Sequence, residues 1–114
     1  MRKLLISGLM AAFALPAAAD RFEDVTIEHN EVADNIYMLT GAGGNMLMSS
    51  GDDGVFLVDD QYTQVAERIA EKIQELSGEE VHYILNTHFH GDHVGSNMWF
   101  ANNQSSTIFA QESF

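Results

Sequence analysis

Three histidines and one aspartate lie within six consecutive positions of this chain: His88, His90, Asp92 and His93. Neutral imidazole and ionised carboxylate are side chains that bind zinc and similar divalent ions. In an extended segment, residues two apart point to the same side, so His88 and His90 can bind one ion together. Gly91 lets the backbone turn, which can direct Asp92 and His93 to a second, neighbouring position. We interpret this internal cluster as a metal site and not as a tag or a loose metal-binding tract.

Residues 88–93 also fit the H-x-H-x-D-H signature, by which the chain resembles the metallo-β-lactamase superfamily of hydrolases. Upstream, residues 54–59 are similar to the family's apolar strand that ends in an aspartate. Residues 41–48 are similar to the hairpin before that strand, and residues 81–87 to the strand that leads into the metal loop. One departure is Ser96, where many members carry a glycine after Gly95. The resemblance implies an α/β (α+β) fold, namely the N-terminal half of a four-layer αββα sandwich.

The resemblance also implies roles for the clustered residues. His88 and His90 would bind at a first metal position, and Asp92 and His93 at a second. Asp92 would in addition hold or transfer a proton as the catalytic acid or base. A complete site is expected to hold two Zn²⁺ ions, with iron or manganese as alternatives. The family's third histidine, bridging carboxylate and final histidine are expected downstream of Phe114.

Two aspartates follow the apolar run of residues 55–58. By resemblance, we expect Asp59 to hold the metal loop from outside the ligand shell. The alternative is a turn residue that caps Thr63 or a neighbouring amide. Asp60 is predicted to cap the start of the following helix.

The first 19 residues have the pattern of a signal peptide. Arg2 and Lys3 precede an apolar segment over residues 4–15, and residues 17–19 are three alanines, so cleavage is predicted after Ala19. Residues 20–114 would then be exported to the periplasm or secreted as the N-terminal part of one domain, which we expect to continue beyond Phe114 or on another segment. No membrane contact is expected after cleavage.

The composition limits the partners and the ligands. Without Arg2 and Lys3, three of the five basic residues remain against 17 acidic ones, a formal charge of −14. Such a surface repels nucleic acid and anionic lipid. The chain has no cysteine, so it has no disulfide and its metal ligands are limited to nitrogen and oxygen. The expected partner is a small-molecule substrate, and the sequence predicts no oligomeric state.

Periodicity and turn signals predict the elements that carry these residues. Strands are expected at residues 31–40, 45–49, 55–59, 81–86 and 107–110, with a hairpin turn at 50–54 and a polar loop at 102–106. The continuously apolar run 55–58 predicts a strand covered on both faces. A helix is expected at 63–76, because its apolar residues form one stripe, with Asp60 or Thr63 as its cap and Gly78 at its end. The strand–helix–strand order predicts a partly parallel sheet.

Several other residues have ordinary explanations. His29 and His82 are interpreted as surface or core histidines without a chemical role. Trp99 and Phe100 are expected in the core, not in contact with substrate. Asn97 is expected either to cap locally or to face the pocket.

These expectations favour an exported metal-dependent hydrolase that uses a metal-activated water. Its substrate would be a β-lactam, a thioester, a lactone or a similar ester, or a phosphoester. One alternative is a non-haem iron persulfide dioxygenase of the same fold. The other is a metal-binding protein without catalytic activity.

Overall fold

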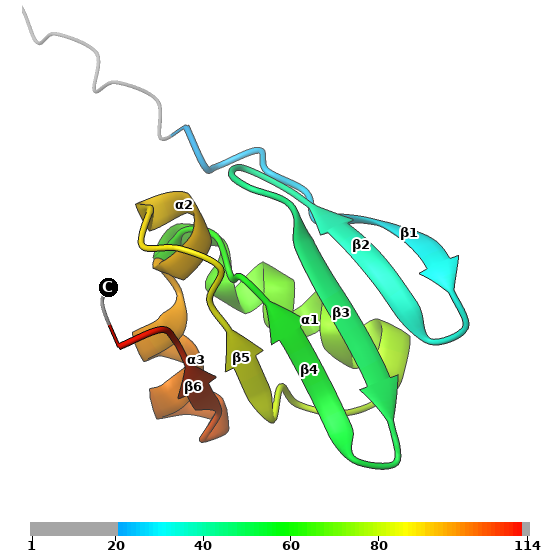
Figure 1. Ribbon diagram of the computed structural model, residues 1–114. Helices are drawn as coiled ribbons and strands as arrows, with labels where there is room; N and C mark the ends of the chain where they lie inside the picture. Colours follow the sequence, from blue (N-terminus) through cyan, green and yellow to red (C-terminus); the bar gives the residue numbers. More distant parts are fainter. Residues whose placement is uncertain (1–20, 113–114) are drawn as a thin grey trace, which may run out of the picture.

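Six strands form one mixed sheet in the computed structural model, which describes residues 21–112 (Figure 1). Their spatial order is their sequence order. Neighbouring strands are antiparallel from β1 to β4 and parallel from β4 to β6. The strands are β1 (Glu28–Ala33), β2 (Ile36–Thr40), β3 (Met46–Gly51), β4 (Gly54–Val58), β5 (Tyr83–Leu85) and β6 (Thr107–Phe109). The predicted signal peptide, residues 1–19, lies outside the described residues.

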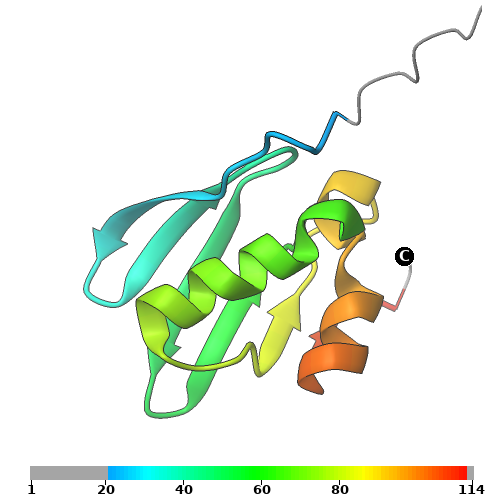
Figure 2. The ribbon, with the colours of Figure 1, turned by 180° about the vertical axis from the view of Figure 1, so that it is seen from behind.

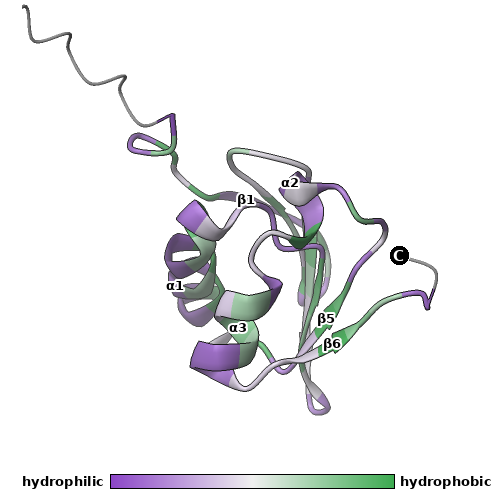
Figure 3. Cartoon of the chain, turned by 90° about the vertical axis from the view of Figure 1, so that its left-hand side faces the viewer, coloured by the Kyte–Doolittle hydropathy of each residue, from purple (hydrophilic) through white to green (hydrophobic). Residues whose placement is uncertain are grey.

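Helices connect the parallel strands. A 3₁₀ turn, η1 (Thr63–Val65), leads into α1 (Ala66–Ser77) between β4 and β5, and α2 (Gly91–Val94) and α3 (Asn97–Gln104) lie between β5 and β6. α1 and α3 cover the same face of the sheet (Figures 2 and 3). The predicted strand–helix–strand unit and the parallel pairing are therefore confirmed. No helix within residues 21–112 combines the length and the apolar character that a bilayer span needs.

The apolar stripe of α1 forms the centre of the core. Val65, Ile69 and Ile73 are fully buried, as predicted. They pack with the strand residues that face the helix, which include Met48, Leu57 and Ile84. The helix ends at Gly78, whose φ of 74° is left-handed and therefore suits glycine. Hydrophilic residues of α1 lie on its outer side (Figure 3).

The other face of the sheet is open within residues 21–112. On β4, Val55 and Leu57 are fully buried, but Phe56 and Val58 are only half-buried. Phe56 stacks on Tyr83 of β5, and Phe109 of β6 is half exposed. The expectation that β4 is covered on both faces is thus met on one face only, because α1 and α3 both pack on the same side.

Three predicted boundaries were wrong. Residues 31–40 do not form one strand: β1 and β2 are joined by a two-residue turn at Asp34 and Asn35, and Asn35 has a left-handed φ of 59°. The first turn of the predicted helix 63–76 is η1. The predicted loop 102–106 is helical as far as Gln104, whose Oε1 accepts the N–H of Val81 and so attaches α3 to the core.

Candidate metal centre

The clustered residues lie at the carboxyl ends of the parallel strands β4 and β5. Residues 86–90 leave β5 through a bend at Thr87 and His88, and α2 begins directly after His90, whose backbone is extended. The loop that leaves β4 lies beside them, because Asp59 N–H donates to the carbonyl of Leu85. Carboxyl ends of parallel strands are where ligands bind in α/β sheets.

His88 and His90 converge as the sequence predicts. Nε2 of His88 lies 3.1 Å from Nδ1 of His90. Two nitrogens bound to one tetrahedral zinc at about 2.0–2.1 Å are separated by about 3.3 Å. The separation is therefore close to that of two nitrogens on one zinc ion, which would replace the hydrogen bond that now joins them.

Asp92 and His93 form a second pair beside the first. Oδ2 of Asp92 lies 3.6 Å from Nε2 of His93, and both side chains remain accessible from solvent. The rings of His88 and His93 have centroids 4.0 Å apart, so the two pairs are neighbours. This arrangement fits two adjacent metal positions, each with two ligands from this chain.

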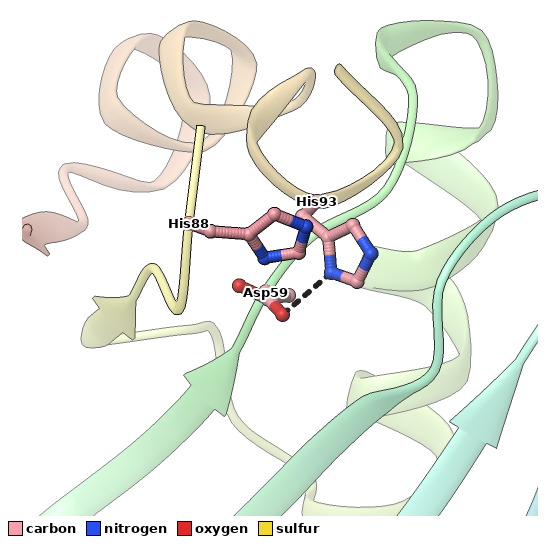
Figure 4. A group of neighbouring side chains, drawn as sticks. All are labelled: Asp59, His88 and His93. Carbon is pink, nitrogen blue, oxygen red and sulfur yellow. Dashed lines mark hydrogen bonds and ion pairs between the residues drawn. The ribbon is translucent and has the colours of Figure 1, made fainter. Parts of the chain in front are cut away.

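Asp59 lies beneath the cluster and is buried (Figure 4). Its Oδ1 accepts the backbone N–H of Thr87 at 2.8 Å, and its Oδ2 accepts the Thr87 hydroxyl and His93 Nδ1, both at 2.7 Å. Ligand atoms of Asp59, His88 and His93 lie within 4.8 Å of one another, so Asp59 is itself near enough to contribute an oxygen. Because both oxygens already accept hydrogen bonds, the geometry favours the predicted orienting role.

Thr87 links this carboxylate to His88, a role that sequence reasoning missed. Its Oγ1 lies 2.8 Å from His88 Nδ1. A hydroxyl has one proton, and Thr87 donates it to the ionised Asp59, so His88 Nδ1 must be the donor in the next bond. Asp59 therefore places protons on Nδ1 of both His88 and His93 and leaves each Nε2 free to bind a metal. The sequence signal was a hydroxyl residue directly before the first histidine.

Asp60 does not cap the helix, contrary to the prediction. Its Oδ1 accepts the N–H of Ser96 at 2.9 Å, and its own N–H donates to the carbonyl of His93. Thr63 does not cap it either, since its hydroxyl donates to the carbonyl of Gly95. Asp60 is fully buried, and this burial raises the pKa of its carboxyl from 3.8 to about 7; the Ser96 hydrogen bond lowers the pKa, and the Asp59 charge raises it further. Asp60 Oδ2 and Ser96 Oγ have no partner among residues 21–112.

The loop between β2 and β3, residues 41–45, packs closely on the second pair. A Cβ at Gly43 would lie 2.9 Å from the Cβ of Asp92, and one at Gly44 would overlap the ring of His93. The N–H of Gly44 also donates to the carbonyl of Asp92 at 3.3 Å. Glycine is therefore required where this loop meets the metal loop.

The remaining histidines lie outside the cluster. His82 Nδ1 accepts the N–H of Val55 at 3.0 Å, and His29 of β1 contacts the ring of Tyr37. Both have the ordinary roles that we expected.

Residues of α3 also have structural roles. Phe100 is fully buried and Trp99 packs against the core, as predicted. Asn97 pairs its side-chain amide with that of Asn86 through two hydrogen bonds, so it attaches the start of α3 to the end of β5.

Residues 30–110 match the model of the metallo-β-lactamase superfamily, and the chain belongs to that family. A subclass B3 metallo-β-lactamase isolated from a soil metagenome library is 27% identical, with a TM-score of 0.68 over 77% of this chain and 34% of that one. A subclass B3 metallo-β-lactamase of Bradyrhizobium japonicum is 24% identical, with a TM-score of 0.65 over the same shares, and shows the fold alone. The chain thus has the N-terminal half of the metallo-β-lactamase fold, as predicted.

One curated relative is named as an oxidase and not as a β-lactamase. The coenzyme F420H₂ oxidase of Methanothermobacter marburgensis is 33% identical over 63 residues, which are 52% of this chain and 16% of that protein. The chain therefore spans about a third of the solved structures and a smaller part of this relative.

Proposed function

We propose that this chain supplies the metal-binding half of an exported metal-dependent hydrolase. One observation carries the proposal: His88 Nε2 and His90 Nδ1 converge at 3.1 Å, with Asp92 and His93 beside them. Such a pattern of nitrogen and oxygen donors suits zinc. When bound, such an ion lowers the pKa of a water and polarises the substrate, which supplies the nucleophile and the Lewis acid of a hydrolysis.

Other residues of the chain would orient the metal ligands and hold a proton. Asp59 and Thr87 fix the tautomers of His88 and His93, so that Nε2 of each of these two rings is unprotonated before a metal binds. Asp92 has a partly exposed carboxylate beside His93, where it would hold the proton that the leaving group takes up. Each pair supplies two ligands, and the third ligand of each metal position would come from residues other than these four.

The substrate class is proposed from the solved neighbours. The neighbour that is 27% identical is a metallo-β-lactamase, which supports a β-lactam, and a thioester, a lactone or a similar ester remains within the same chemistry. The predicted signal peptide supports an extracytoplasmic substrate.

The test uses variants of the complete protein that the gene encodes. His88→Ala and His90→Ala should each remove one ligand of the first position and reduce metal content, whereas Asp92→Asn should reduce turnover more than occupancy of the first position. Metal content is measured by mass spectrometry, and turnover with a chromogenic lactam and a thioester. His82→Ala is the control, because it also removes an imidazole with a hydrogen bond but lies outside the site. Full metal content and full rate in His88→Ala would refute the proposal.

A redox enzyme is the second candidate, because the curated relative is named an oxidase. The same histidine and carboxylate ligands bind iron. Iron in the purified protein, together with oxygen consumption and no hydrolysis of either substrate, would favour this candidate over the hydrolase. Metal binding with neither activity would favour a binding protein.

A further inference from the structure

A buried glutamine holds the loop that packs on the second metal position. Gln61 is fully buried, three residues after β4 ends. Its Oε1 accepts the N–H of Ala42 at 3.1 Å, and its Nε2 donates to the carbonyl of Gly44 at 2.7 Å. One amide group thus connects two points of the loop between β2 and β3.

An amide makes both of these bonds at any pH, whereas a carboxyl can make them only when it is protonated. An ionised glutamate has acceptors and no donor, and a methionine has neither in useful strength. The backbone of Gln61 also has a left-handed φ of 56°, a conformation that costs free energy for a residue with a β-carbon. A strained conformation persists only where surrounding contacts enforce it, which points to the side chain's bonds as the reason for this residue.

The loop that Gln61 holds contacts Asp92 and His93. Gly44 lies against the ring of His93 and donates to the carbonyl of Asp92 at 3.3 Å, and Gly43 lies against the side chain of Asp92. His93 is therefore fixed from two sides, by Asp59 at Nδ1 and by the backbone of Gly44 at its ring. Loss of the glutamine amide would release the second of these supports.

We propose that Gln61 is a positioning residue for the second metal position, the one formed by Asp92 and His93. It acts through the loop of residues 41–45 and touches neither ligand with its own amide. The proposal rests on the proposed function to the extent that the complete protein binds two ions.

The test is a metal titration of the complete protein with Zn²⁺ against a chromogenic chelator, and with Co²⁺ followed by its absorption spectrum. Gln61→Glu keeps the size of the side chain and, when its carboxyl is ionised, keeps the acceptor for Ala42 but loses the donor for Gly44, so its titrations are repeated at rising pH. Loss of an outer contact typically weakens metal binding by about 10–100-fold. Because Gln61 acts through the loop, we expect the second ion to bind about tenfold more weakly, with the first ion unchanged within about twofold. Gln61→Met should have the same selective effect.

Gln104→Met is the matched control. Gln104 also uses its side-chain amide to hold a backbone group, the N–H of Val81. This contact lies before the start of β5, whereas the histidine cluster follows the end of that strand. The Gln104→Met substitution should lower thermal stability and leave the affinities for both metal ions unchanged. Near-ultraviolet circular dichroism of each apoprotein shows that the variants are folded; if Gln61→Met fails to fold, Gln61→Glu alone decides.

The outcomes separate this inference from the proposed function. Wild-type protein that binds two ions, with a folded Gln61→Met or an ionised Gln61→Glu that binds both equally well, would refute the inference and leave the function standing. Equal weakening of both ions would also refute it, because the effect would then be one of general stability. Wild-type protein that binds one ion only would refute the inference, and wild-type protein that binds no ion would refute both.

Discussion

Replacement of Asp59 by asparagine should reverse the proton positions on two histidines at once. The backbone N–H of Thr87 requires an oxygen at the position of Oδ1, so the new NH₂ group must take the position of Oδ2. There it faces Thr87 Oγ1 and His93 Nδ1, both of which donate to the aspartate in the native protein. Both Thr87 Oγ1 and His93 Nδ1 must therefore accept a hydrogen bond from the new NH₂ group. His93 then carries its proton on Nε2, and Thr87 donates to His88 Nδ1, so His88 also carries its proton on Nε2.

The size of the effect follows from what is lost and what is kept. The same number of hydrogen bonds is formed, and asparagine tolerates the left-handed φ of 61° at this position, so the backbone gains no strain. Exchange of charge-assisted for neutral bonds should cost about 1–2 kcal/mol of stability. Metal binding loses more, because each Nε2 is now occupied by a proton. We expect affinity to fall about 10–100-fold at each position, which is about 1.4–2.7 kcal/mol per ion.

The assay has two parts. Nitrogen-15 NMR of the histidine rings in the metal-free protein should show the proton on Nδ1 of His88 and His93 in the wild type and on Nε2 in Asp59→Asn. Chelator titration measures the affinities, with Asp53→Asn in the exposed β3–β4 turn as the charge-matched control. Unchanged tautomers, or unchanged affinity with changed tautomers, would show that Asp59 does not act through the protons.

Further predictions concern neighbouring groups and export. Thr87→Val should weaken binding of the first ion about tenfold in a chelator titration, whereas Thr87→Ser should bind it as the wild type does, because serine keeps the hydroxyl. Equal affinities in the two variants would exclude a role of the hydroxyl in metal binding. Asp60 has a folded-state pKa of about 7 against an ordinary 3.8, so its contribution to stability is complete below about pH 4 and is lost as the pH rises through 7. Asp60→Asn keeps the acceptor for Ser96 and should remove this pH-dependent loss, which amounts to up to about 4 kcal/mol of the free energy of unfolding. The urea concentration at the unfolding midpoint should therefore be higher for the variant than for the wild type at about pH 8, but not at about pH 4. Parallel pH profiles of the two proteins would contradict this prediction. N-terminal sequencing of periplasmic protein should begin at Asp20, and protein that retains residues 1–19 would exclude cleavage after Ala19.

The sequence predicts those features that depend on local spacing. His88, His90, Asp92 and His93 lie within six residues, so their spacing alone keeps them close enough to form two pairs, although the segment bends at Thr87 and His88 and is not extended throughout as predicted. The stripe of α1 and its end at Gly78 likewise depend on helical periodicity and on one residue that suits a left-handed φ.

Features that depend on distant partners could not be predicted. Asp60 looked like a helix cap because it precedes a helix, yet its partner is Ser96, 36 residues away. Gln61 has no local signal, since its amide binds a loop 17 to 19 residues upstream. The loop predicted at residues 102–106 was wrong for the same reason: a polar run normally indicates a loop, but here the helix α3 continues to Gln104, whose side chain is held by Val81.

The three residues after β4 have a consequence for changes in chain length. Asp59, Asp60 and Gln61 each hold a different part of the site, and the left-handed backbone at Asp59 and Gln61 directs their side chains. Insertion or deletion of one residue there would misdirect all three side chains together. The turn between β3 and β4, whose Asp52 and Asp53 are exposed, would accept extra residues far more easily. Natural length variation and engineered insertions should therefore accumulate at that turn and avoid the loop after β4.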